Sequence, residues 1–236
     1  MTWSIVAHDA KTGAFGVAVT TRFFAVGALC PHVQSGIGAV ATQALINPLY
    51  GPKALALLAN EVDPAEAVRQ LIAGDEGREA RQLHMIDRRG RIAQHTGGNC
   101  IGWCGHLKGD GYAVAGNMLA GAAVIEETAK AYEARSALPF AERLIAALDA
   151  GQAAGGDKRG KQSAALRIHT SESYPALDLR VDDHPEPLAE LRRLHEVSKQ
   201  IFEPFMKFLP SAENPAGIYD RAVIDAELAR LAAAKA

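Results

Sequence analysis

The sequence predicts an α+β fold in which antiparallel β-sheets are layered with helices. Pairs of short apolar segments joined by tight polar turns come in blocks, and so do pairs of helical segments, instead of alternating one by one as parallel β-α-β units do. Each sheet and each helix pair has an apolar face that must be covered. We therefore expect two stacked, mostly antiparallel sheets between helical layers.

The strands are predicted from hairpin patterns. Two polar turns, ending at Gly13 and at Gly90, each separate two short apolar segments, which is typical of β-hairpins. Two further apolar segments with strand character stand alone. The expected strands are residues 4–7, 15–20, 38–42, 83–86, 91–95 and 163–168.

The helices are predicted from apolar residues at intervals of three and four. Asp63 followed by Pro64 is typical of a helix start, because aspartate accepts from free amides and proline suits the first turn. The expected helices are residues 52–60, 64–72, two segments through 124–132 and 140–148, 187–202 and 219–231.

The chain has 236 residues, 48% of them hydrophobic, which suits one large domain with a small addition. We place the domain at residues 1–203 and a C-terminal helical appendage at residues 204–236, where three prolines interrupt the pattern. The appendage carries more apolar residues than a free tail should expose. It is expected to pack on the domain or on a partner subunit, and a homodimer is the default expectation.

Charge and composition exclude several classes of function. With 25 basic and 27 acidic residues the net charge is −2, so no broad positive field favours nucleic acid or an anionic membrane. No apolar run reaches membrane-spanning length. The three cysteines suit a reducing compartment, so a cytoplasmic location is expected. Cys100, Cys104 and His106 lack a second ligand pair for zinc, and we expect neither metal nor cofactor.

Thr2 is notable for its position. If Met1 is removed, Thr2 becomes the N-terminus at the start of a strand and carries a hydroxyl nucleophile and a free amine in one residue. The amine, with a reference pKa of about 7.7 to 8.0, can accept the hydroxyl proton near neutral pH. An ordinary strand threonine is the alternative.

The segment 155–162 nearly matches a phosphate-binding loop, but Gln162 stands where that motif needs a hydroxyl. A phosphate loop also follows a strand and opens a helix, whereas here a helix precedes and a strand follows. The segment is better interpreted as a turn leading into a strand, in which Arg159 can bind a substrate carboxylate and Asp157 can orient Arg159 or pair with an amine. A solvated connection is the alternative.

Seven segments of the chain form a wider pattern, at residues 2–7, 21–27, 38–43, 95–97, 116–119, 155–166 and 179–184. Together they resemble the bacterial "domain of unknown function 1028" family over about residues 1–200. That family is grouped with the N-terminal nucleophile hydrolases, so the resemblance implies a four-layer αββα sandwich, cleavage of amide bonds and Thr2 as the nucleophile.

The candidate site follows from these motifs. Thr2 and Asn117 are the candidate catalytic residues, Asn117 as a donor to the oxyanion together with main-chain amides. The candidate substrate-binding residues are Arg159, Asp157, Gln162, Ser163, Thr96 and His95. The expected function is hydrolysis of an amide in a small anionic or peptide-like substrate. The alternative is a non-catalytic binder of small molecules on the same scaffold.

Overall fold

The structure is a computed structural model that describes residues 2–233. Met1, whose removal the candidate nucleophile requires, and residues 234–236 lie outside the described range. The chain forms two compact units, residues 1–191 and 192–236. The predicted appendage, residues 204–236, belongs to the second unit.

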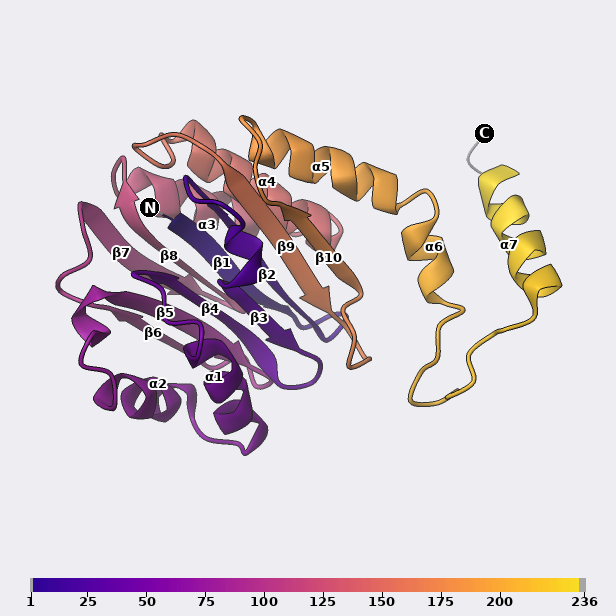
Figure 1. Ribbon diagram of the computed structural model, residues 1–236, viewed down its shortest axis with the longest axis horizontal. Coiled ribbons are helices and arrows are strands. Elements are labelled where there is room, and N and C mark those ends of the chain that lie inside the picture. Colours follow the sequence, from indigo (N-terminus) through magenta and orange to yellow (C-terminus); the bar gives the residue numbers. More distant parts are fainter. Residues whose placement is uncertain (1, 234–236) are drawn as a thin grey trace. The chain divides into compact units, whose positions relative to one another are not determined.

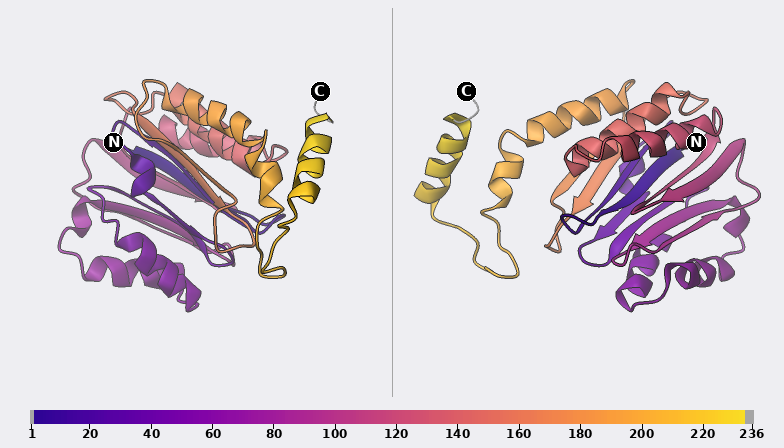
Figure 2. Two further views of the ribbon diagram at one scale, coloured as in Figure 1. Left: turned by 45° about the vertical axis from the view of Figure 1, so that its right-hand side comes forward. Right: turned by 180° about the vertical axis from the view of Figure 1, so that it is seen from behind.

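The first unit is a four-layer α+β sandwich, so the predicted fold class is confirmed (Figure 1). A six-stranded antiparallel sheet with the order β10-β9-β2-β1-β8-β7 faces a four-stranded one with the order β3-β4-β5-β6. Helices α1 and α2 cover the outer face of the smaller sheet, and α3 and α4 cover the outer face of the larger one (Figure 2).

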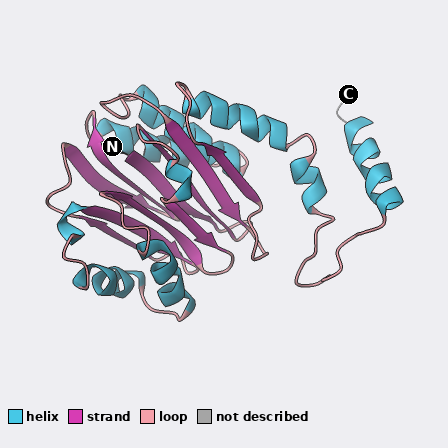
Figure 3. Ribbon diagram, in the orientation of Figure 1, coloured by secondary structure: helices cyan, strands magenta, loops and turns pink. Residues whose placement is uncertain are grey.

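The strands alternate with helices only in blocks (Figure 3). The strands are β1 (Thr2–Asp9), β2 (Ala14–Thr21), β3 (Pro31–Gln34), β4 (Gly38–Ala44), β5 (Arg81–Asp87), β6 (Ile92–Thr96), β7 (Trp103–Gly109), β8 (Tyr112–Leu119), β9 (Ser163–His169) and β10 (Leu177–Val181). The α-helices are α1 (Tyr50–Ala59), α2 (Pro64–Ala73), α3 (Ala123–Ala134), α4 (Phe140–Ala153), α5 (Pro187–Ser198), α6 (Phe202–Met206) and α7 (Arg221–Ala233), and 3-10 turns span Val26–Ala28 and Arg78–Ala80.

The two predicted hairpins, β1–β2 and β5–β6, share one turn chemistry. Asp9 accepts hydrogen bonds from the Lys11 amide and the Thr12 hydroxyl, while Asp87 accepts from the amides two and four residues on. Both turns include a glycine at positive φ, Gly13 at 72° and Gly90 at 73°, a conformation that residues with a Cβ adopt at a cost. These local signals are the reason that the sequence predicts both hairpins.

Between the sheets the interior is apolar at one end and polar at the other. Side chains such as Val6, Phe15 and Ile86 form the apolar part. A second cluster, with Leu83 and Met85 of β5, packs under α1 and α2. Consecutive residues of β5 thus point to opposite faces of the sheet, as the pleat requires. The functional site lies at the polar end.

Several elements differ from the sequence-based expectation. Strands β3, β7, β8 and β10 were not predicted, although the segment ending at Gly116–Asn117 has strand character. The helix expected over residues 187–202 ends at Ser198, and α6 begins separately at Phe202. The Ser198 hydroxyl donates to the carbonyl of His195 and to Glu203, which competes with continued helical bonding.

In the second unit, α6 and α7 contact each other. Lys207 pairs with Glu227 of α7, and the rings of Phe205 and Phe208 lie 5.8 Å apart. Several large apolar side chains of this unit are exposed, among them Tyr219 and Val223. Among the described residues, no helix has the length and apolar character needed to cross a membrane.

Candidate active site

Thr2 begins the strand at the centre of the larger sheet. It lies between two neighbours, with Thr21 of β2 opposite it on one side and Asn117 of β8 on the other. Its side chain shares the face of Ser4 and Val6, which point between the two sheets. Pairing with β2 and with β8 therefore fixes Thr2, and its side chain lies on the face of the larger sheet that is turned towards the smaller one.

The immediate partners of Thr2 are polar. Its Oγ1 lies 3.0 Å from Oγ1 of Thr21, and both side chains are almost fully buried. The Nδ2 of Asn117 is 3.5 Å from the carbonyl oxygen of Thr2 and 3.2 Å from Oε1 of Gln82. Asn117 thus ties the backbone of Thr2 to the facing sheet.

A cavity of about 380 Å³ opens beside Thr2. Thr21, Gln43, Asn99 and Asn117 contribute polar groups, but most of its wall is apolar. Among the lining residues that the structure describes, Arg159 alone carries a permanent charge. The lining residues are Thr2, Thr21, Phe23, Val26, Leu29, Cys30, Gln43, Ala44, Leu45, Ile46, Ala80, Asn99, Cys100, Ile101, Asn117, Met118 and Arg159.

The loop that carries Arg159 is fastened to both strands beside Thr2. Asp157 bridges to Leu119 of β8 and accepts from the amide of Arg22, just after β2. The buried carboxylate of Asp157 also accepts from the Arg159 amide at 2.7 Å and from its guanidinium at 3.2 Å. Asp157 therefore holds Arg159 at the cavity, with about 41% of the arginine side chain still exposed.

A buried polar network joins the two sheets behind Thr2. Gln43 donates to Oε1 of Gln82 at 2.7 Å and accepts from the Ser4 hydroxyl at 2.6 Å. Ser4 also lies 2.7 Å from Nε2 of His84. Gln82 donates to Oγ1 of Thr96 at 2.9 Å. These directional contacts fix the amide group of Gln82, which in turn holds Asn117.

Gln82 and Gln94 bridge the sheets in the same way. The Nε2 of Gln82 donates to the carbonyls of Gly105 and Gly116, which are paired between β7 and β8. The Nε2 of Gln94 donates to the carbonyls of Leu107 and Val114, the next pair on the same face. Each of these two glutamines of the smaller sheet thus donates to the carbonyls of one register pair of β7 and β8.

Burial controls the ionisation of groups around the site. Desolvation, assisted by the nearby His106, lowers the pKa of His84 to about 3, so its ring is neutral. Desolvation raises the pKa of Cys30 to about 12 and also raises that of Cys100. Both cysteines at the cavity are therefore thiols, and neither is an activated nucleophile.

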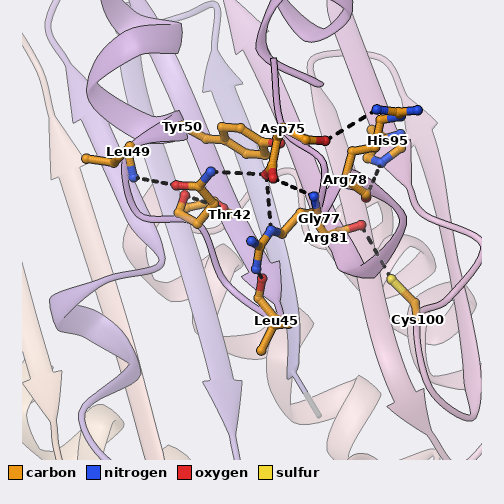
Figure 4. A network of polar contacts seen from close by, with 11 residues as sticks. Thr42, Leu45, Leu49, Tyr50, Asp75, Gly77, Arg78, Arg81, His95 and Cys100 are labelled. Atoms are coloured by element: carbon orange, nitrogen blue, oxygen red, sulfur yellow. Dashed lines mark hydrogen bonds and ion pairs between the residues drawn. The ribbon is translucent and has the colours of Figure 1, made fainter. Parts of the chain in front are cut away.

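An ion pair behind the cavity holds one side of its wall (Figure 4). Asp75 accepts from the Tyr50 hydroxyl at 2.7 Å and from Nε of Arg81 at 3.2 Å. Arg81 in turn donates to the carbonyl of Leu45, and the Cys100 thiol donates to the carbonyl of Arg81. The hydrogen bonds from Tyr50, Asn47 and Arg81 hold the pKa of Asp75 well below its usual range. The contacts of Arg81 with Leu45 and Cys100 anchor two lining segments to β5.

Strained backbone also clusters at the cavity. Three residues other than glycine adopt positive φ there: Ala25 at 53°, Ala44 at 69° and Met118 at 54°. Ala44 and Met118 line the cavity, and Ala25 precedes the lining residue Val26. Such conformations cost about 1 to 3 kcal/mol each and concentrate at functional sites.

The structure brings some predicted site residues together and separates others. Thr2, Asn117 and Arg159 line one cavity, and Asp157 supports Arg159. Ser163 lies behind the wall, where its hydroxyl donates to the carbonyl of Phe23 and accepts from the amide of Val26.

The other three predicted residues do not line this cavity. Thr96 is linked to the lining residue Asn117 only indirectly, through the side chain of Gln82. His95, the residue before it, lies on the opposite face of β6, with its ring 2.9 Å from the carbonyl of Arg78. The backbone N–H of Gln162 donates to the carbonyl of Thr21, and its side-chain amide donates to the carboxylate of Asp183.

Sequence reasoning missed the buried glutamine and histidine network. In β5, Gln82 and His84 alternate with Leu83 and Met85, a pattern that ordinarily indicates one solvated face. Only pairing in the sandwich shows that both faces are buried. Gln43 and Gln82 lie on neighbouring strands that pair so that these residues are register partners. Two side-chain amides at matching positions are the signal that could have indicated a polar interior.

Two comparisons with known proteins give the same family. The model of the family of unknown function DUF1028 matches residues 2–191. The crystal structure of protein SPO2555 from Silicibacter pomeroyi, described with the same family, is 31% identical, with a TM-score of 0.87 over 93% of this chain and 96% of that chain.

A more distant structure, Anbu (ancestral beta-subunit) from Yersinia bercovieri, is 14% identical, with a TM-score of 0.38 over 84% of this chain and 97% of that one. The comparison with curated proteins finds no match. The family match over most of the sequence and the likeness to a structure of the same family lead to one conclusion: the chain belongs to the DUF1028 family.

Proposed function

We propose that the protein is an amide-bond hydrolase of the N-terminal nucleophile type, acting on a small anionic or peptide-like substrate. One observation carries the proposal: Thr2 begins the central strand and places its hydroxyl at a cavity that also holds Asn117 and Arg159. Apart from the main chain at Thr2, the described lining offers no group that is a general base near neutral pH. The amine that Thr2 gains when Met1 is removed fills that role.

In the first half of the reaction, Oγ1 of Thr2 attacks the amide carbonyl carbon, and the hydroxyl proton passes to the Thr2 amine. The tetrahedral intermediate collapses as the carbon–nitrogen bond breaks, and the leaving nitrogen takes the proton from the resulting ammonium. An ester between the acyl group and Thr2 remains. Thr21, 3.0 Å from the attacking oxygen, orients the hydroxyl for this step.

In the second half, water attacks the ester and gives its proton to the same amine. The ester carbon–oxygen bond breaks, Oγ1 recovers the proton, and the carboxylic acid product leaves. Asn117 contributes an N–H donor to both oxyanions together with main-chain amides. Its 3.5 Å contact to the Thr2 carbonyl is at the long limit of a hydrogen bond, so that N–H can turn to a substrate oxygen at little cost.

The test combines mass and activity measurements. Intact-protein mass spectrometry should show loss of one methionine, and profiling against amides and acyl amino acids should find turnover. Thr2→Ala should lower kcat/KM by about a thousandfold or more, whereas Thr2→Ser, which keeps the hydroxyl, should retain measurable activity. Turnover that is unchanged in Thr2→Ala would contradict the proposal.

The second candidate is a non-catalytic binder of small molecules on the same scaffold. It is favoured by the composition of the described cavity wall, in which Arg159 is the only charged side chain and both cysteines are protonated thiols. If Met1 is retained, the amine of Thr2 is part of a peptide bond and cannot accept a proton. A retained methionine with ligand binding but no turnover would select this function.

A further inference from the structure

We infer that the ligand is an N-acyl amino acid whose acyl chain is aliphatic and of medium length, an inference that rests on the proposed function and names its substrate class. The acyl chain would lie on the apolar wall of the cavity, and the carboxylate would bind Arg159. The scissile amide would then lie between them, at Thr2. Three properties of the cavity support this assignment.

The first property is the exposed apolar character of one wall of the cavity. This wall is formed by the β4–α1 connection and by the segment before β7. Leu45 and Ile101 line the cavity, yet 66% and 69% of these residues are exposed to solvent. Ile46 continues the same apolar surface. Large apolar side chains gathered at the mouth of a cavity are favourable only when another apolar group covers them. An aliphatic chain is such a group.

The second property is that this wall is held in place before any ligand binds. Arg81 donates to the carbonyl of Leu45, and Asp75 fixes Arg81 through an ion pair. On the other side, the Cys100 thiol, next to Ile101, donates to the carbonyl of Arg81. A wall already fixed by these contacts loses little conformational entropy on binding, so apolar contact is converted efficiently into affinity.

The third property is size. The cavity measures about 380 Å³, more than twice the roughly 150 Å³ of an apolar cavity that holds one benzene molecule. On that scale it accommodates an acyl chain of roughly eight to twelve carbon atoms. An acetyl group would leave most of the apolar wall in contact with water.

The polar end of the ligand is specified by Arg159. The buried Asp157 holds its guanidinium, the Arg159 side chain as a whole remains 41% exposed, and Arg159 lines the cavity, where a carboxylate can approach it. The loop of Arg159 is joined to the strands on both sides of Thr2. One charge near the nucleophile and an apolar wall beside it fit a ligand with one carboxylate and one hydrocarbon chain.

The experiment is isothermal titration of the full chain carrying Thr2→Ala, which prevents turnover, with N-decanoylglycine, N-acetylglycine and N-decanoylglycinamide. N-Decanoylglycine should bind about a hundredfold more tightly than N-acetylglycine, because the longer chain covers apolar wall. Adding Arg159→Gln should lower the affinity for N-decanoylglycine about tenfold. The result should equal the affinity that the protein with Arg159 intact has for the uncharged N-decanoylglycinamide. Equal affinities for the decanoyl and acetyl ligands would overturn the inference.

A matched pair of variants locates the chain. Leu45→Asp places a charge on the wall and should weaken N-decanoylglycine about tenfold or more, whereas Leu49→Asp should leave its affinity unchanged. Leu49 is an equally exposed leucine four residues away, at 62%, that does not line the cavity. Equal effects of both substitutions would overturn the assignment of the wall.

The outcomes also separate this inference from the proposed function. Selective binding of N-decanoylglycine to the wild-type protein without hydrolysis would support the ligand class and refute the hydrolase. Hydrolysis of amides with the same kcat/KM for acetyl and decanoyl substrates would support the hydrolase and overturn the ligand class.

Discussion

The hydroxyl groups of Thr2 and Thr21 lie 3.0 Å apart across the β1–β2 ladder, where the two residues are register partners. The contact joins the candidate nucleophile to a strand that leads into the cavity wall at Phe23 and Val26. Thr2 and Thr21 lie at the open end of the β1–β2 hairpin, away from its turn, and their contact sets the orientation of the Thr2 hydroxyl.

Thr21→Val should lower kcat/KM about tenfold. Valine has the shape of threonine but lacks the hydroxyl, and the loss of one hydrogen bond that orients a nucleophile corresponds to about 1.4 kcal/mol of barrier. Steady-state kinetics on a substrate found by amide profiling provide the measurement.

Thr20→Val is the control for this change. The Thr20 hydroxyl donates to the carbonyl of Ser163, and Thr20 does not line the cavity. Its loss should lower the free energy of unfolding by about 1 kcal/mol and leave kcat/KM unchanged. If both valine variants lose the same activity, the Thr2–Thr21 contact has no special role.

Gln82→Met should both destabilise the protein and impair the site. Gln82 is fully buried, and its Oε1 accepts from Gln43 and Asn117. Methionine leaves these donors unsatisfied, so the free energy of unfolding should fall by about 2 to 4 kcal/mol. Urea denaturation checks the stability, and kcat/KM should fall because Asn117 loses the acceptor that positions it.

Gln94→Met separates the two effects. Gln94 bridges to the same ladder, but its partners are Leu107 and Val114, away from Thr2. It should lower stability and leave kcat/KM within about twofold of wild type. A loss of activity as large as that of Gln82→Met would show that general loosening, rather than the position of Asn117, is responsible.

Acid should destabilise the protein partly through His84. Burial lowers the pKa of His84 to about 3 in the folded protein, against about 6.5 in the unfolded chain. The unfolded chain therefore binds the proton first, and stability falls as the pH decreases from about 6.5 towards 3. At pH 5 this contribution amounts to about 2 kcal/mol.

His84→Gln should remove that dependence, because glutamine can keep a hydrogen bond to Ser4 but does not titrate. In urea denaturation at pH 7 and pH 5, the loss of stability between the two pH values should be smaller than in wild type by about 2 kcal/mol. The same loss in both proteins would mean that His84 is not the responsible histidine.

The C-terminal appendage, residues 204–236, is expected to mediate a homodimer. It exposes Tyr219 at 84% and Val223 at 50%, together with Ile218, which is more apolar surface than a solvated segment needs. A chain that ends at residue 203 should have the molar mass of one subunit in light scattering, and the full chain that of two. A shortened chain that stays dimeric would exclude residues 204–236 from the interface.

The fold was predictable where signals are local. Asp9 with Gly13 and Asp87 with Gly90 indicate both hairpins, and Asp63 accepts from the Ala65 amide as the cap of α2. Strand β7 has glycines and exposed residues that weaken the alternation, whereas β8 is almost wholly buried and takes its place in the sheet by pairing with β1, far earlier in the chain. Such distant pairing is not encoded in any short window of sequence.

The site was predictable in part for a similar reason. Thr2, Asn117 and Arg159 belong to segments that resemble a family, and the structure places them at one cavity. The apolar wall at Leu45 and Ile101 comes from two connections that are both hydrogen-bonded to Arg81, one at Leu45 and the other at Cys100. Two adjacent residues, His95 and Thr96, differ in relevance only because a strand turns them to opposite faces.

The glutamine bridges fix the register in which the two sheets face each other. Gln82 and Gln94 each donate to carbonyls on both β7 and β8, so sliding one sheet over the other would leave buried donors and acceptors without partners. Apolar side chains alone, which interact without directional preference, would permit such sliding. The pocket at Thr2 is lined from both sheets, so its shape belongs to the one register that satisfies both glutamines.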